Sequence, residues 1–173
     1  LIYFQEDYFL QSKVDTDKVK YCLKVLQYEQ AVCIRLKGRK PNLSYKGYKD
    51  IGEIGLDEPY RVSTQATIWN KYELLDILKK GESGWDFELN GGKKRGYKLN
   101  KIFLSTKERV IPYTFTAIEK GRYTYEALKL CNDHGISLNC KARPCDTYLT
   151  FLIRKNFFIK LLIRFFVRMK KTI

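Results

Sequence analysis

The chain has 173 residues, of which 33 are lysine or arginine and 19 are aspartate or glutamate, giving a formal charge of +14 at neutral pH. This length can bury the core of one domain, and the positive charge suits a polyanionic partner such as nucleic acid, anionic lipid or a nucleotide diphosphate. The first residues lack the features of a signal peptide, and we expect an earlier part of the same domain to precede Leu1.

The five cysteines are odd in number and irregularly spaced along the chain. Cys140 and Cys145 are the only close pair, and no histidine lies near enough in sequence to complete a zinc-binding pattern. We therefore expect reduced thiols in a cytoplasmic protein, and no disulfide framework.

The first third of the chain predicts two strands that flank a helix. Residues 1–5 and 31–37 are short apolar runs typical of buried strands. Between them, the carboxylate of Asp15 is suited to cap a helix that continues to about Tyr28. Residues 38–59 are rich in glycine, lysine, tyrosine and aspartate, and we expect a long loop there.

The middle and later parts of the chain continue this alternation of strands and helices. Asn70 is expected to cap a helix that ends at Gly81, and His134 is expected to end the helix of residues 123–133 rather than to act in catalysis. The predicted strands are residues 60–69, 101–105 and 109–118. The pattern favours an α/β domain with some antiparallel pairing near its end.

Three stretches together indicate a function. They are "QEDYFL" (residues 5–10), "STQATIWNKYELLDILKKGESGWDFE" (residues 63–88) and "AIEKGRYTYEALKLCNDHGISL" (residues 117–138). Their order and residues resemble bacterial sugar-nucleotide glycosyltransferases of the GT-A type, especially those found among surface-polysaccharide genes. The resemblance covers about residues 1–143 and implies a Rossmann-like mixed sheet flanked by helices. Residues 1–148 are then the metal- and acceptor-binding half of that domain, and residues 149–173 form a basic amphipathic tail.

The resemblance also implies where the nucleotide-sugar donor binds. Glu6 and Asp7 occupy the place of the family's Asp-X-Asp metal motif, where Mg²⁺ or Mn²⁺ neutralises the diphosphate leaving group. The adjacent pair departs from the usual spaced aspartates, so one carboxylate binds metal while the other binds sugar, or metal is dispensable. Asp7 is the favoured ligand, and the alternative is a strand that ends in a solvated turn. Lys120 and Arg122 are candidate diphosphate ligands, although solvated basic loops are commoner.

An inverting transferase also needs a base for the acceptor hydroxyl, and Glu88 and Asp86 are the candidates. The two carboxylates share one face if this segment is extended. Trp85 is suited to stack on an acceptor sugar, with Gln65 as a further acceptor-binding candidate. The alternative is a solvated turn around a buried Trp85, whereas Trp69 is expected to pack in the core.

The last 27 residues, 147–173, contain seven basic residues and no acidic one. Lys160, Arg164 and Arg168 recur at every fourth position and would form a narrow stripe on a helix. The wide apolar face is formed by Phe157, Phe158, Leu161, Leu162, Phe165 and Phe166. The charges disfavour a transmembrane helix and favour a helix that lies on an anionic membrane surface. The alternative is an amphipathic helix packed on its own domain or on a partner.

The resemblance thus implies a metal-assisted, inverting glycosyltransferase that moves a sugar from a nucleotide-sugar donor to a polysaccharide or lipid-linked acceptor. We expect it in the cytoplasm, peripheral at the inner face of the membrane, with no nucleic-acid partner. The alternative is a basic module without catalysis that binds nucleic acid or a protein. In that case aromatic residues interleaved with lysine, as in "YKGYKDIG" and "GYKLNKIF", would stack on bases.

Overall fold

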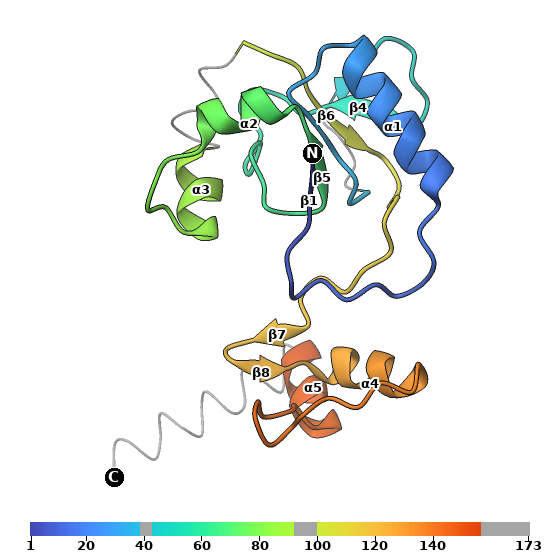
Figure 1. Cartoon of the computed structure of the whole chain (residues 1–173), viewed down its shortest axis with the longest axis vertical. Helices are drawn as coiled ribbons and strands as arrows, with labels where there is room; N and C mark the ends of the chain where they lie inside the picture. The colour runs from blue at the N-terminus through green and yellow to red at the C-terminus, as the bar shows by residue number, and fades with distance from the viewer. Residues whose placement is uncertain (39–42, 92–99, 157–173) are drawn as a thin grey trace. The chain divides into compact units, whose positions relative to one another are not determined.

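The structure is a computed structural model that describes residues 1–38, 43–91 and 100–156 (Figure 1). The described chain is a mixed α/β protein that divides into two compact units. The first unit contains residues 1–6 and 12–113, and the second contains residues 7–11 and the chain from Thr114 onward. Each unit is considered by itself below.

A six-stranded mixed sheet forms the centre of the first unit. Its strands lie in the order β1-β5-β2-β6-β4-β3. β2 and β6 are parallel, whereas β5 is antiparallel to both β1 and β2, and β4 is antiparallel to both β6 and β3. The predicted mixed sheet is therefore confirmed. The strand bounds are β1 Ile2–Tyr3, β2 Cys33–Arg35, β3 Leu43–Ser44, β4 Ile51–Glu53, β5 Thr67–Trp69 and β6 Phe103–Thr106.

Three helices accompany this sheet: α1 (Thr16–Tyr28), α2 (Lys71–Ile77) and α3 (Gly84–Asn90). Figure 1 shows α1 on one side of the strands and α2 with α3 on the other. The side chains of Asp15 and Asn70 cap α1 and α2 as predicted, because their oxygens accept hydrogen bonds from backbone amides of the first turn.

The core between the sheet and the pair α2 and α3 is centred on Trp69. This residue is buried, as predicted, and lies opposite Cys33 in the register of β2 and β5. Its ring meets the rings of Phe87 and Phe103 edge-on, each at a centroid distance of 6.4 Å. Such packing of large apolar side chains is the main stabilising contribution to a core of this size.

Several predicted elements differ from the structure: the strand expected over residues 60–69 is confined to β5, and the helix expected to end at Gly81 ends at Ile77. The expected loop of residues 38–59 contains β3 and β4, and the polar composition of this segment hid both strands. Residues 84–90 are helical rather than extended, because Ser83 and Asp86 form a capping box. Residues 109–118 do not form a continuous strand: Arg109 makes one isolated bridge to Lys37, and Ile118 begins a separate hairpin.

The second unit contains a β-hairpin and two helices. Strands β7 (Ile118–Glu119) and β8 (Arg122–Tyr123) are joined by Lys120 and Gly121, whose φ angles of 51° and 75° are those of a tight two-residue turn. Helix α4 (Tyr125–Asp133) ends at His134, which is its C-cap as predicted. Helix α5 (Tyr148–Lys155) follows a short connecting segment.

The expectation of reduced cysteines is wrong for one pair. Cys140 and Cys145 form a disulfide, with their Cα atoms 5.4 Å apart. The side chain of Asn139 accepts hydrogen bonds from the amides of Lys141 and Ala142, and this turn brings the two cysteines together. The other three cysteines, Cys22, Cys33 and Cys131, are free and buried.

The predicted amphipathic tail falls mainly on residues 157–173, which lie outside the described residues. This applies to every membrane-binding candidate, namely Phe157, Phe158, Lys160, Leu161, Arg164, Phe165 and Arg168. Among the residues that the structure describes, no helix has the length and the hydropathy needed to cross a membrane.

Gly38 is required by a close approach between two segments of the first unit. Its φ is +75°, and a β-carbon there would collide with the backbone of Glu108 and Arg109. Gly47 has nearly the same φ, +76°, but a β-carbon there would meet no atom within 4 Å. Gly47→Ala therefore serves as a matched control that tests the backbone conformation alone.

We predict that Gly38→Ala lowers the free energy of unfolding far more than Gly47→Ala does. Gly47→Ala, the control, should lower the free energy of unfolding by about 1–2 kcal/mol, the usual penalty for an L-amino acid in the left-handed backbone conformation. Gly38→Ala adds a steric conflict that only movement of the backbone can relieve. Urea unfolding of both variants measures the difference, and equal losses would show that residues 38 and 109 do not approach closely.

The carboxylate of Glu29 connects the end of α1 to the segment between β3 and β4. It accepts hydrogen bonds from the hydroxyls of Tyr45 and Tyr48, at 2.8 and 2.9 Å, and from the ammonium of Lys46 at 2.6 Å. The bond from Lys46 is the main cause that lowers the pKa of Glu29, and the two tyrosines lower it further.

A lowered pKa makes the contribution of Glu29 to stability depend on pH. The stabilisation is present above the unfolded-state pKa, about 4.3, and is lost as the pH falls through the lower folded-state pKa. We predict that Glu29→Gln destabilises the fold at pH 7 and that the difference from the unsubstituted protein narrows below about pH 4. Thermal unfolding between pH 3 and 7 tests this, with the exposed Asp57→Asn as control. A difference that stays constant with pH would contradict the assignment.

Candidate functional site

The candidate site lies along one edge of the six-stranded sheet. Tyr3, Thr67, Arg35 and Ser105 pair in turn across β1, β5, β2 and β6, so they form one row near this edge. β1, β2 and β6 run in the same direction, and their carboxyl ends meet at this edge, where β5 begins. Open α/β sheets bind ligands beyond the carboxyl ends of their parallel strands.

Two of the three informative stretches of sequence meet at this edge. The position of a β-carbon on Gly84, at the start of α3, lies 3.6 Å from Cγ2 of Thr64 and 3.7 Å from Nε2 of Gln5. Gln5 follows β1, and Thr64 precedes β5. The first turn of α3 is therefore in contact distance of both segments.

Glu88, on the last turn of α3, is bound to the segment that precedes β5. Its Oε1 atom accepts hydrogen bonds from Ser63 Oγ (2.9 Å), Thr64 N (2.6 Å) and Thr64 Oγ1 (2.8 Å). These three donors suit an ionised carboxylate, which can only accept hydrogen bonds. Within the described residues, Oε2 of Glu88 has no hydrogen bond or ion pair, so one oxygen is fixed and the other is available.

Gln65 and Tyr113 form the next contact along the edge. The hydroxyl of Tyr113 donates to Oε1 of Gln65 at 2.9 Å and accepts from the amide of Ala66 at 3.4 Å. Burial raises the pKa of Tyr113, which therefore stays protonated. The ring of Phe4 packs edge-on against Tyr113 at a centroid distance of 5.4 Å. No pattern in the sequence indicated Tyr113, because its partner lies 48 residues away.

Two buried arginines position the segment that precedes β5. Nη2 of Arg35 lies 2.5 Å from the carbonyl oxygen of Tyr60 and 3.2 Å from that of Arg61. Nη2 of Arg61 donates to the carbonyl of Lys101 at 2.7 Å, and its guanidinium lies 4.0 Å from the ring centroid of Phe103. Both arginines were missed by sequence reasoning, because a basic residue is usually exposed.

The predicted donor-binding carboxylates belong to different units. Glu6 is exposed, makes no hydrogen bond or ion pair within the described chain, and belongs to the first unit. Asp7 belongs to the second unit, where its Oδ2 lies 2.7 Å from Thr116 Oγ1 and its carbonyl accepts from the amide of Ala117. The two residues form a turn after β1.

The donor set of this turn fits a hard cation only if the cation takes other ligands as well. Across residues 1–38, 43–91 and 100–156, no three His, Cys, Asp or Glu side chains cluster as a metal site would require. Mg²⁺ is often held by one or two carboxylates together with substrate phosphates and water. Glu6 and Asp7 belong to different units, so each stays a candidate ligand only by the resemblance of the sequence.

The other predicted site residues have diverse surroundings. Asp86 accepts hydrogen bonds from the amide and the hydroxyl of Ser83. Both bonds lower the pKa of Asp86, and the bond from the hydroxyl is the larger cause. Trp85 is 73% exposed, so the alternative of a buried residue is wrong. Arg122 is bound to Asp146 and to the carbonyl of Cys145, both at 2.9 Å, whereas Lys120 is exposed at the hairpin turn.

Asp86 and Glu88 do not share a face. The prediction that they would do so required an extended segment, and the segment is helical. Two residues that are two apart on a helix point about 200° apart, and these two lie on α3. Trp85 and Glu88 are instead three apart and lie on the same side of the helix. The structure thus groups Glu88 with Trp85 rather than with Asp86.

Comparison with known proteins finds no matching family model, no matching curated protein and no matching solved structure. A function must therefore be argued from the arrangement of the residues themselves.

We predict that Ser63→Ala lowers the free energy of unfolding by about 1–3 kcal/mol, because it removes a donor to the charged carboxylate of Glu88. In a double-mutant cycle with Glu88→Ala, the second substitution should cost much less once the first is present. Chemical denaturation of the four proteins measures this coupling. Additive losses would show that Ser63 and Glu88 do not interact.

Proposed function

We propose that this chain acts as a glycosyltransferase that moves a sugar from a nucleotide-sugar donor to a polysaccharide or lipid-linked acceptor. The observation that carries the proposal is the carboxylate of Glu88, which three donors hold by one oxygen at the edge where open α/β sheets bind ligands. The resemblance of residues 5–10, 63–88 and 117–138 to GT-A enzymes supports the same reaction.

Glu88 is proposed as the general base. A base of this kind must be held so that an unpartnered oxygen can accept the proton of the acceptor hydroxyl as that hydroxyl attacks the anomeric carbon. The three bonds to Oε1 fix the carboxylate, and Oε2 is available for the hydroxyl. Asp86 is less suited to this role, because Oδ2 is engaged in the cap of α3.

Trp85 is proposed to bind the acceptor. Its indole is 73% exposed, so its ring face is accessible to a sugar. It lies one helical turn before Glu88 on α3, so a sugar stacked on the indole would have a hydroxyl near the carboxylate. Gln65 is proposed as a further acceptor-binding residue, and Tyr113 binds its side-chain oxygen.

The donor is proposed to bind at the turn formed by Glu6 and Asp7. A divalent cation held there would neutralise the charge that develops on the leaving diphosphate. Lys120, which is exposed, is the remaining candidate for the diphosphate, since Arg122 is bound to Asp146. The basic residues 157–173 are proposed to bring the protein to an anionic membrane surface at the cytoplasmic face.

The test is to screen the protein for hydrolysis or transfer with a panel of sugar nucleotides, with and without Mn²⁺. We predict that Glu88→Gln lowers the rate constant for transfer by about 10²-fold or more, the scale expected for loss of a general base. Glutamine keeps an oxygen that can accept the three hydrogen bonds, so the fold and the donor affinity should change little. Asp76→Asn, an exposed carboxylate on α2, is the matched control and should leave the rate unchanged.

Three outcomes would contradict these assignments. Absence of binding and turnover with every sugar nucleotide would reject the enzyme. Weakened donor binding with normal turnover in Glu88→Gln would place Glu88 in the donor site. Normal transfer in Glu88→Gln, together with loss of transfer in Asp86→Asn, would assign the base to Asp86.

A further inference from the structure

The disulfide between Cys140 and Cys145 closes a short turn on the surface of the second unit. Cys140 is exposed and Cys145 is half-buried, whereas the three free cysteines of the chain are buried. A dissolved thiol can therefore approach this disulfide from the side of Cys140 without any opening of the fold. Exposed disulfides of this kind are the ones that exchange with external thiols.

The backbone on the Cys140 side of the turn is fixed by bonds that involve neither sulfur atom. The side chain of Asn139 accepts hydrogen bonds from the amides of Lys141 and Ala142. The carbonyl of Asn139 also accepts from the amide of Arg143 at 3.0 Å. None of these bonds requires the disulfide, so the turn can hold two thiols close together, and such proximity favours closure of the pair.

The β7–β8 hairpin fixes the other end of the turn. The amide of Tyr123 donates to the carbonyl of Pro144 at 2.9 Å, and the carbonyl of Tyr123 accepts from the amide of Asp146 at 2.8 Å. Arg122 donates to the carbonyl of Cys145 and to the carboxylate of Asp146, both at 2.9 Å. These four bonds are also independent of the disulfide, so they hold Cys145 on the hairpin whether the pair is open or closed.

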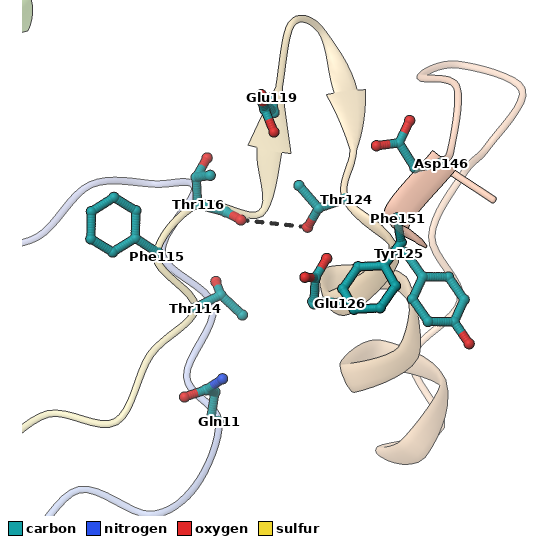
Figure 2. A pocket seen from close by; sticks show the side chains of 10 residues that line it. All are labelled: Gln11, Thr114, Phe115, Thr116, Glu119, Thr124, Tyr125, Glu126, Asp146 and Phe151. Atoms are coloured by element: carbon teal, nitrogen blue, oxygen red, sulfur yellow. Dashed lines mark hydrogen bonds between the residues drawn. The ribbon is translucent and has the colours of Figure 1, made fainter. Parts of the chain in front are cut away.

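A cavity of about 360 Å³ lies next to this fixed end of the turn. Asp146 follows Cys145 directly, and Figure 2 shows Asp146 among the side chains that line the cavity. Its side chain is 2% exposed and is held by the guanidinium of Arg122 rather than by the disulfide. Opening of the pair therefore leaves this wall in place. The segment that can respond is residues 134–143, which connect α4 to the disulfide and are mostly exposed.

The surroundings of the pair are positively charged. Lys141 and Arg143 lie inside the turn, and residues 134–145 contain no aspartate or glutamate. The guanidinium of Arg143 lies 5.5 Å from the ring centroid of Tyr123, on the hairpin. Neighbouring cations stabilise a thiolate, which is both the attacking and the leaving species in thiol–disulfide exchange.

We propose that Cys140 and Cys145 form a redox-active pair that external thiols open and that external disulfides close. One thiolate of a dithiol attacks the sulfur of Cys140, the bond to Cys145 breaks, and Cys145 leaves as a thiolate and takes up a proton. The second thiol of the reductant then displaces Cys140, which also takes up a proton. The reductant becomes a disulfide, so two electrons and two protons pass to the protein, and an external disulfide reverses the reaction.

Opening of the pair releases residues 134–143 from the hairpin while Cys145 keeps its place. The pair is thus a latch on the segment after α4, and its state follows the thiol and disulfide content of the surroundings. Disulfides of cytoplasmic proteins are usually transient in this way. The inference goes beyond the proposed function and does not depend on it.

The experiment equilibrates the full chain, without denaturant, in glutathione buffers and separately with dithiothreitol. N-ethylmaleimide then traps the free thiols, and peptide mass analysis locates them. We expect Cys140 and Cys145 to become labelled at millimolar thiol, with an unchanged circular dichroism spectrum. Cys22, Cys33 and Cys131 are internal controls and should stay unlabelled until the protein is unfolded. Removal of the reductant and addition of oxidised glutathione should restore the disulfide.

Variants test which sulfur is attacked. With oxidised glutathione, Cys145→Ser should form a mixed disulfide on Cys140 at least about 10-fold faster than Cys140→Ser forms one on Cys145, because access limits the rate of exchange. The double variant Lys141→Gln with Arg143→Gln should slow the reaction of Cys140. Lys129→Gln, which changes an exposed lysine on α4, is the matched control and should leave the rate unchanged.

Hydrogen exchange of the oxidised and the reduced protein measures the latch. The amides of residues 134–143 should exchange faster after reduction, whereas the bonded amides of Tyr123 and Asp146 should keep their rates. The proposal is overturned if reduction requires a denaturant, if the reduced protein unfolds, or if Cys145 reacts as fast as Cys140. Unchanged exchange of residues 134–143 after reduction would also overturn it.

Discussion

The arrangement of the first unit depends on the contacts of one buried guanidinium, that of Arg61. This residue is only 1% exposed. Burying a charge is unfavourable unless its donors are satisfied, and here carbonyl oxygens of Ile54 and Lys101 accept from it while Phe103 lies beneath it. These contacts join the residues after β4, the start of β6 and the segment before β5. Arg35 binds the carbonyls of Tyr60 and Arg61 and fixes the same segment from β2.

The position of Glu88 follows from this arrangement. Ser63 and Thr64 come directly after the fixed segment, so their donors have a defined place before α3 packs against them. Phe87, the neighbour of Glu88, is buried against Trp69 and sets the rotation of α3. Burial of one side of the helix thus directs Glu88 to Ser63 and Thr64, while Trp85 remains exposed. A polar site is positioned here by apolar packing together with two buried cations.

Local patterns predicted those features of the fold that depend on neighbouring residues. The caps at Asp15 and Asn70, the end of α4 at His134 and the burial of Trp69 were all confirmed. Helix α3 was missed because "GWDFE" alternates aromatic and acidic residues, a period that also suits a strand. β3 and β4 were missed because each has only two or three residues and gains its stability from pairing.

The partners of the candidate site residues could not be predicted, since they are set by tertiary structure. Glu88 and Thr64 are 24 residues apart, and Asp7 and Thr116 are 109 apart, so no local spacing indicates either pair. The same reason explains why the formal charge of +14 does not show which positive charges a ligand can reach. Arg35 and Arg61 are bound to backbone carbonyls, and Arg122 is bound to Asp146, so these positive charges are engaged inside the protein.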